Sequence, residues 1–302
     1  MANLHDIKNR IKSVKSTGKI TQAMKMVASA KVKKAENAAK ESRPYTKFLV
    51  KIFEELMRNE QKLDAQKFDT ALENYPALLQ KREVKNVGLF ILTSDKGLAG
   101  AYNTNVIKEA IKTIENYKEK GIGSKLFIVG LKGIIPLKKA FPEGSEVEII
   151  KNYAKIPPLV EVEVAKMIAE DIAQAYVSGK IDKIEVIFTE FKSMLSYKVN
   201  KFNLLPIEVP KSEAAINPEM IFEPSKEEVL KKLVPLYVAN TIYTALKEAS
   251  ASELAARMNA MSNATKNAEE MVKSLSIAYN KARQYNITQE LLEVVSGANA
   301  IS

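Results

Sequence analysis

The sequence contains no cysteine, no tryptophan and a single histidine, His5. Without cysteine the chain can form no disulfide, thiolate metal site or cysteine nucleophile, and a reducing compartment is its natural setting. A single histidine rules out a multi-histidine metal site and argues against a Ser-His-Asp triad. We expect His5 to be a solvated terminal residue, and we expect no catalytic residue, no metal and no cofactor.

Long apolar runs are also missing. No run reaches the roughly 18 residues that a membrane-spanning helix needs. The N-terminus has neither the apolar region of a signal peptide nor an Arg- and Ser-rich transit segment. These absences favour a bacterial cytoplasmic protein.

Glycine and proline are nearly absent from both ends of the chain. Of eleven glycines, only Gly18 and Gly297 lie outside residues 88–179. Of eleven prolines, only Pro44 and Pro235 lie outside residues 76–224. Turns are therefore confined to the middle, and the two ends favour uninterrupted helix.

The N-terminal segment, about 2–57, has a stripe of apolar residues at helical spacing. Its members are Leu4, Ile7, Ile11, Val14, Ile20, Met24, Val27, Ala35 and Ala38. The phase slips near Gly18, which predicts an imperfect stripe. We expect Pro44 to kink this helix or to end its regular part.

The C-terminal segment opens with Ser225 followed by Glu228, the pattern of a capping box. We expect Pro235 to interrupt this helix early. A strict seven-residue repeat then predicts a left-handed coiled coil. Its positions are Leu254, Met258, Met261, Thr265, Ala268, Val272, Leu275, Tyr279 and Ala282.

The two ends are predicted to pair as antiparallel helices. A buried position in a larger bundle is the alternative, but the sequence shows no third long helix. The repeat ends at Ala282, so we expect the C-terminal tip to extend beyond its partner as a single helix.

The middle of the chain alternates strand and helix, which implies a mostly parallel α/β sheet. Strands are predicted at 87–93, 126–130, 147–150, 184–189 and 199–207, with helices at 102–119, 131–141 and 159–178. The fold class is therefore α/β plus coiled coil, with long terminal helices around a Rossmann-like middle domain. The predicted segments are 1–58 (N-terminal helix), 59–83 (surface excursion), 84–210 (α/β foot domain) and 211–302 (foot segment and C-terminal helix).

Phosphate-binding motifs are not evident in this middle domain. The sequence has no G-x-x-x-x-G-K-[ST] pattern, and Gly121–Leu126 lacks the third glycine of G-x-G-x-x-G and precedes a strand. We interpret it as a tight turn. The segment Ser94–Gly100 follows a strand, where α/β sites usually form, but no histidine, cysteine or second carboxylate lies nearby. A turn in which Asp95 caps is favoured over an interaction loop or an active site.

Charge is strongly positive and unevenly distributed. The formal net charge is +10 and the pI about 9.3, so nucleic acid, a membrane surface or an acidic protein are possible partners. Residues 1–34 hold nine basic residues and one acidic residue, Asp6, whereas the last nineteen residues contain no Lys or Arg.

Both ends carry distinctive strings. Residues 7–11 read IKNRI, 17–28 read TGKITQAMKMVA, 251–258 read ASELAARM, 279–284 read YNKARQ, 287–291 read ITQEL and 295–298 read VSGA. Together, and in this order, they resemble the gamma subunit of F-type ATP synthases over essentially the whole chain. The segment 94–100 also looks like the family's middle-domain loop.

The resemblance implies a rotating central shaft in the F1 sector. Paired terminal helices would enter a ring of three alpha and three beta subunits, and the α/β domain would form a foot on the epsilon subunit and the c-subunit ring. Rotation would couple ion flow, including hydrogen ion transport, to ATP synthesis or hydrolysis. The chain itself would not be an enzyme.

The resemblance also assigns contact residues. Met24 and Lys25 match the segment facing beta, and Phe222, before Glu223 and Pro224, matches the foot region near epsilon and the c ring. The positions that match contacts with the beta catch loops are Arg257, Gln284, Thr288 and Glu290. Redox control of the kind found in thiol-regulated relatives is excluded, because cysteine is absent.

A peripheral position on the cytoplasmic face of the bacterial plasma (inner) membrane follows from the resemblance, with membrane association only through the complex and no nucleic acid bound. The alternative is a basic coiled-coil nucleic-acid-binding protein, which rests on charge alone and lacks interleaved aromatic residues. A small α/β enzyme with helical arms is the third hypothesis.

Overall fold

The computed structural model describes residues 4–58, 77–142, 144–207, 223 and 225–301. The chain divides into two compact units. One consists of Met1–Ser29 with Arg257–Ser302, and the other of Ala30–Ala256. The long helices α1 (Leu4–Arg58) and α6 (Lys226–Ile301) contribute to both units.

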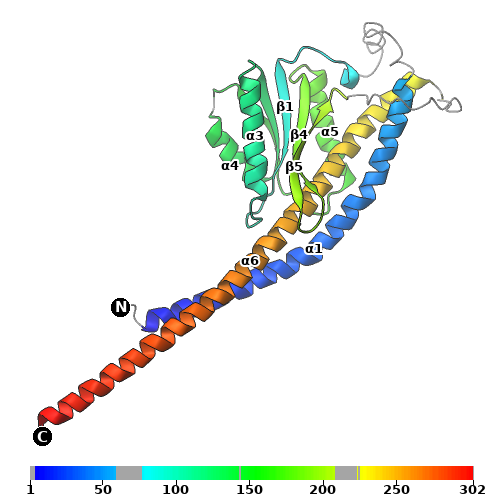
Figure 1. Ribbon diagram of the computed structural model, residues 1–302. Coiled ribbons are helices and arrows are strands. Elements are labelled where there is room, and N and C mark those ends of the chain that lie inside the picture. Colours follow the sequence, from blue (N-terminus) through cyan, green and yellow to red (C-terminus); the bar gives the residue numbers. More distant parts are fainter. Residues whose placement is uncertain (1–3, 59–76, 143, 208–222, 224, 302) are drawn as a thin grey trace. The chain divides into compact units, whose positions relative to one another are not determined.

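The larger unit contains a five-stranded sheet of described residues with the order β3-β2-β1-β4-β5 (Figure 1). Neighbouring strands among β1 to β4 are parallel, and β5 pairs antiparallel with β4. The strands are β1 (Asn86–Leu92), β2 (Gly123–Val129), β3 (Val147–Tyr153), β4 (Lys183–Phe191) and β5 (Tyr197–Leu205). The mostly parallel sheet predicted from the alternating pattern is confirmed.

Helices cover both faces of this sheet. They are α3 (Tyr102–Lys118), α4 (Leu131–Ala140) and α5 (Val162–Val177). Side chains alternate along a strand, so Leu89 of β1 packs with the core under α3 and α4, whereas Phe90 faces the core under α5. Burial on both faces explains why β1 is apolar almost throughout.

The core under α5 includes residues from both long helices. Leu49 and Phe53 of α1 and Leu230 and Ile242 of α6 are buried in it, together with Phe188 of β4. The part of the helix pair that belongs to this unit therefore shares a hydrophobic core with the sheet.

The short 3-10 helix η2 (Ala77–Leu79) belongs to the same core, in which Leu78 and Leu79 are buried. Arg82 follows; its Nε lies 2.7 Å from Asp182 Oδ1 and its guanidinium lies over the ring of Tyr176. The last part of the expected surface excursion 59–83 is thus tied into the domain. Its first part, 59–76, lies outside the described residues.

Neither long helix stops at its proline. Pro44 lies inside α1 and Pro235 inside α6, so the expectations that Pro44 could end the regular part of its helix and that Pro235 would interrupt its helix are wrong. Both prolines are exposed, which lets water satisfy the carbonyl group left without an N–H partner. The predicted helix start is confirmed, because the Glu228 amide donates to Ser225 Oγ at 3.3 Å.

Candidate partner-binding surface of the paired helices

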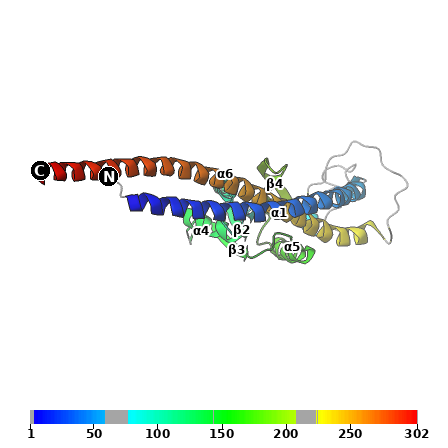
Figure 2. The ribbon, with the colours of Figure 1, turned by 90° about the horizontal axis from the view of Figure 1, so that it is seen from below.

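Within the smaller unit, α1 and α6 meet along a seam of small residues. The hydroxyl groups of Thr21 and Thr265 lie 2.8 Å apart. A Cβ atom placed on Gly18 would lie 3.4 Å from the Cβ of Ala268. Residue numbers rise along α1 as they fall along α6, so the two helices are antiparallel, as predicted. Figures 1 and 2 show the two helices side by side.

The face of α1 that meets α6 differs from the predicted stripe. Ile20 and Val27, which were expected on the buried face, are 58% and 57% exposed. Gly18, Thr21 and Ala28 are buried in their place. The predicted slip near Gly18 is therefore wrong. The buried face of α1 continues through Gly18 and Thr21 in steps of three and four residues, and a search for apolar side chains alone misses these two positions.

The predicted repeat on α6 is confirmed by burial. All nine of its positions, from Leu254 to Ala282, are buried or half-buried. Thr265, its one polar member, bonds to Thr21. A break in the apolar repeat is thus matched by a polar residue on the partner helix.

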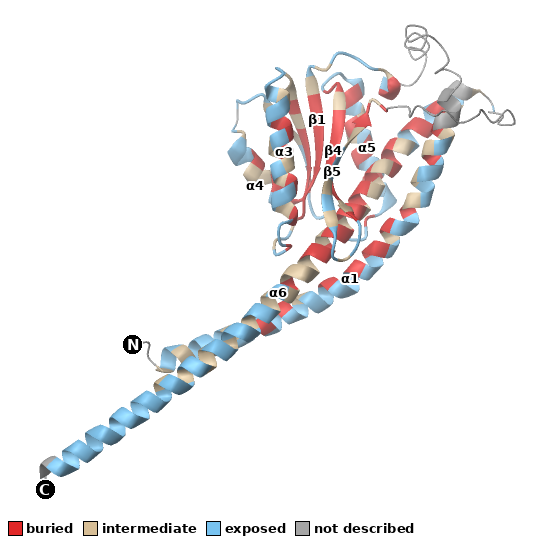
Figure 3. Cartoon of the chain, viewed as in Figure 1, coloured by how far each residue is buried: buried red, intermediate tan, exposed pale blue. Residues whose placement is uncertain are grey.

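Beyond this repeat, α6 is exposed on all sides. Every residue from Arg283 to Asn299 is exposed (Figure 3), which agrees with the predicted single-helix tip. Seventeen residues of helix span about 25 Å at 1.5 Å per residue. We call this segment, residues 283–299, the exposed tip.

The exposed tip carries large apolar side chains. They are Tyr285, Ile287, Leu291, Leu292, Val294 and Val295, each 48% to 69% exposed. At 3.6 residues per turn they occupy roughly half of the circumference of the helix. An apolar surface of this kind marks a site of association with another macromolecule.

Three of the predicted contact residues, Gln284, Thr288 and Glu290, belong to the exposed tip, and a fourth, Lys25, is exposed on α1. Within the exposed tip, Thr288 Oγ1 donates to the Gln284 carbonyl at 2.9 Å. Met24 is half-buried. All five belong to the smaller unit, together with Arg257, which is half-buried. Phe222 lies outside the described residues.

The outer surface of α1 in this unit is basic. Lys8, Arg10, Lys12, Lys15, Lys19 and Lys25 are all exposed. Within the described residues, none of these six side chains takes part in an ion pair. Their charge is available to an acidic partner.

The Ser94–Gly100 segment is a turn, as favoured from the sequence. Asp95 Oδ1 accepts a hydrogen bond from the Leu131 amide at 3.2 Å, and Oδ2 accepts one from the Lys155 amide at 2.9 Å. Asp95 therefore caps the start of α4, which follows the neighbouring strand β2, and not the start of α3, the next helix along the chain. Both carboxylate oxygens hold backbone groups, which argues for a structural role.

The described residues offer no phosphate-binding loop at Gly121, no cluster of metal ligands and no membrane-spanning helix. Gly121, with φ +70°, makes the tight turn that leads into β2, as interpreted from the sequence. Across the described ranges, no three His, Asp or Glu side chains come together as metal ligands would. In those ranges no helix has an apolar stretch long enough to cross a bilayer.

A buried charged cluster, which the sequence did not reveal, joins α3 to β4 and β5. Glu185 Oε1 accepts hydrogen bonds from Tyr117 Oη at 2.7 Å and Lys183 Nζ at 2.8 Å, and Lys201 Nζ lies 3.6 Å from Oε2. Burial acts to raise the pKa of Glu185, but these donors and the lysine charges outweigh it and hold the pKa below its ordinary value.

Known proteins are similar to this chain in sequence and in fold. The ATP synthase family model matches residues 3–301. The ATP synthase gamma chains of Synechococcus sp. (strain JA-3-3Ab) and Trichormus variabilis (strain ATCC 29413 / PCC 7937) are each 38% identical, over 328 and 329 residues, with 100% of both chains covered.

Two solved structures are also similar. The central stalk and c-ring structure of Tetrahymena thermophila mitochondrial ATP synthase matches with a TM-score of 0.60 and 28% identity, covering 81% of this chain and 99% of its own. The Euglena gracilis mitochondrial ATP synthase matches in fold with a TM-score of 0.68 and 18% identity, covering 99% and 94%. The chain belongs to the ATP synthase gamma-chain family.

Proposed function

We propose that this chain is the rotating central shaft of an F1 sector, which couples ion flow through a membrane ring to ATP synthesis or hydrolysis. The observation that carries this proposal is the exposed tip of α6. A solitary helix with apolar residues over about half of its circumference needs a surrounding protein surface, and a sleeve of other subunits would supply one.

The composition of the exposed tip suits a bearing. Its charged residues are Arg283, Glu290 and Glu293, and its last residues are apolar or small. Few charges means few ion pairs that would hold the tip at one angle. No proline interrupts α6 beyond Pro235, and its only glycine is Gly297, so the helix is stiff enough to carry torque.

The basic surface of α1 supports an acidic partner. Six exposed cations, none of which forms an ion pair with another described residue, would meet acidic segments of the beta subunits in turn as the shaft rotates. Each catalytic site would then face a different side of the shaft, which shifts its conformational population without any chemistry on the shaft. We infer that the chain itself is not catalytic.

The partners in this proposal are three alpha and three beta subunits, the epsilon subunit and the c-subunit ring. Met24, Lys25, Arg257, Gln284, Thr288 and Glu290 would face the beta subunits, and Phe222 would lie in the foot near epsilon. The complex would hold the chain at the cytoplasmic face of the bacterial plasma membrane.

Co-expression with alpha and beta subunits tests this function. We expect a complex that hydrolyses ATP, and we expect removal of residues 287–302 to weaken torque before it prevents assembly. Complete loss of assembly on that truncation would contradict the bearing role. Salt-sensitive DNA binding, with no alpha or beta subunit co-purifying, would instead favour the nucleic-acid-binding alternative.

Cross-linking tests rotation directly. Cysteines introduced at Ala282 and in the beta catch loop should form a disulfide, and oxidation should stop ATP hydrolysis until a reductant is added. The matched control carries only the cysteine at Ala282. Full activity in the cross-linked complex would show that this segment need not rotate.

A further inference from the structure

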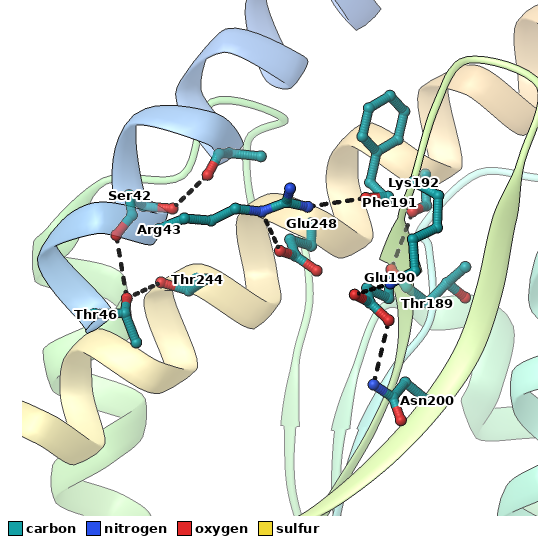
Figure 4. Close-up of polar contacts among 12 residues, drawn as sticks. Ser42, Arg43, Thr46, Thr189, Glu190, Phe191, Lys192, Asn200, Thr244 and Glu248 are labelled. Carbon is teal, nitrogen blue, oxygen red and sulfur yellow. Dashed lines mark hydrogen bonds and ion pairs between the residues drawn. The ribbon is translucent and has the colours of Figure 1, made fainter. Parts of the chain in front are cut away.

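A single arginine in the larger unit joins both long helices to the sheet. Arg43 lies on α1; its Nε donates a hydrogen bond to Glu248 Oε1 of α6 at 3.0 Å (Figure 4). Its Nη2 donates to the carbonyl oxygen of Phe191, the last residue of β4, at 2.9 Å. The guanidinium group of Arg43 thus joins three elements: α1, which carries it, and α6 and β4, which accept its two hydrogen bonds.

The acidic partner of this contact is well shielded from water. The side chain of Glu248 is 9% exposed and that of Arg43 is 38% exposed. Burial raises the pKa of Glu248, and the nearby Arg43 charge opposes that rise. Arg43 therefore compensates a carboxylate that water reaches poorly.

Other polar contacts join the same elements in pairs. Thr46 of α1 shares a hydrogen bond of 3.0 Å with Thr244 of α6 and accepts one of 2.7 Å from Asn240 Nδ2. Ser252 of α6 donates to the carbonyl of Thr189, two residues before Phe191 on β4, at 3.0 Å. Arg43 is at the point where the α1–α6 contacts and the contacts with β4 meet.

These polar contacts add what the surrounding apolar core lacks. Leu49 and Phe53 of α1 and Ile242 of α6 pack into the shared core, but the hydrophobic effect that drives this packing is non-directional. Charge-assisted hydrogen bonds depend on distance and angle, so they fix the position of one element against another. The bonds of Arg43 oppose sliding of either helix along β4.

We propose that Arg43 is the positioning residue that locks the helix pair to the α/β sheet, so that torque on one turns the other without slip. The inference rests on the rotor function proposed above. In a shaft, the load at this junction acts along the contact surface between the helix pair and the sheet. The bridge from Arg43 to Glu248 and Phe191 resists it directly.

The test uses the complete ATP synthase complex in sealed vesicles. The variants are Arg43→Met, Arg43→Lys, the double variant Arg43→Met with Glu248→Met, and the matched control Lys47→Met, an exposed position on the same helix. Two quantities are measured: the thermal stability of the complex, and the number of ions pumped per ATP hydrolysed against an opposing gradient.

Arg43→Met should lower both quantities, because it removes the bridge and leaves Glu248 buried without its partner. The double variant should recover thermal stability, because the buried charge is gone, but its pumping ratio should stay at least twofold below that of the wild type. Arg43→Lys should keep the charge but not both contacts, and should pump with a ratio between those of the wild type and Arg43→Met. Lys47→Met should match the wild type.

Recovery of both stability and pumping in the double variant would overturn the proposal, because it would reduce Arg43 to a counter-ion for Glu248. An unchanged pumping ratio in Arg43→Met would overturn it as well. Failure of the rotor function itself would look different: the wild type and Lys47→Met would then also fail to assemble or to pump.

Discussion

Thr21 and Thr265, which are 244 positions apart in the sequence, share a hydrogen bond of 2.8 Å between α1 and α6. Each hydroxyl oxygen also lies within hydrogen-bonding distance of a carbonyl of its own helix, Gly18 at 3.0 Å and Met261 at 2.8 Å. Because a hydroxyl carries a single hydrogen, one threonine donates to the other while the acceptor donates to its own helix. This pair favours the observed alignment of the two helices, because an alignment that places either hydroxyl against an apolar side chain loses the hydrogen bond between them.

Replacing either threonine with valine should therefore cost stability, while replacing both should not. We expect Thr21→Val or Thr265→Val to lower the free energy of unfolding by about 1 kcal/mol, and the double variant to lie close to the wild type. Urea unfolding of the full chain in a double-mutant cycle measures the coupling. Strictly additive losses would show that the two hydroxyls do not act as a pair.

Gly18 should accept a small side chain but not a large one. Gly18→Ala adds a Cβ that meets Ala268 Cβ at 3.4 Å, so the gain in helix propensity of about 1 kcal/mol should be largely kept. Gly18→Leu should push the helices apart and destabilise the pair by about 1–3 kcal/mol. Thermal unfolding followed by circular dichroism compares them, with Ile20→Ala on the exposed face as control. Equal stability of the Leu and Ala variants would contradict close packing at this seam.

The charged cluster at Glu185 should make stability depend on acid. Because its pKa is lowered in the folded chain, Glu185 stabilises the fold above the ordinary pKa of a glutamate and loses that contribution as the pH falls below it. Glu185→Gln should lower the free energy of unfolding at pH 7 by about 1–3 kcal/mol.

The difference between Glu185→Gln and the wild type should shrink in acid, as the wild-type carboxylate becomes protonated. Urea unfolding at several pH values follows it. Glu148→Gln is the matched control, because the Glu148 side chain is 64% exposed in its ion pair with Lys125, and a surface pair should contribute less. A loss for Glu185→Gln that is the same at pH 3 and pH 7 would exclude an ionic contribution.

The exposed tip should matter to the complex and not to the chain alone. Gln284→Ala, Thr288→Ala and Glu290→Ala remove exposed side chains, so each should change the stability of the isolated chain by no more than about 0.5 kcal/mol. In the assembled complex, the same variants should lower the rate of ATP hydrolysis. Lys112→Ala, an exposed position on α3, is the control. Unaltered hydrolysis in all three variants would remove these residues from the contact with the beta subunits.

Local patterns were enough to predict most of the secondary structure. The repeat on α6 has a helical periodicity, the helices α3 and α5 lie between strands in the alternating pattern, and the short, continuous apolar run at β1 is typical of a strand buried on both faces. The face of α1 was predicted less well. Gly18 and Thr21 are buried because Ala268 and Thr265 lie opposite them, and a pattern within one helix contains no information about its partner.

The sequence by itself determined that two long helices flank a mostly parallel α/β domain along the chain, because turn-forming residues are confined to the middle and apolar spacing identifies each element. Only the tertiary structure decided how these elements are joined. The bridge from Arg43 to Glu248 and Phe191 and the cluster around Glu185 bring together residues from distant parts of the chain. Which residues become partners depends on how the elements pack in three dimensions. The bonds form because a buried charge is costly unless an opposite charge or a hydrogen-bonding group lies beside it.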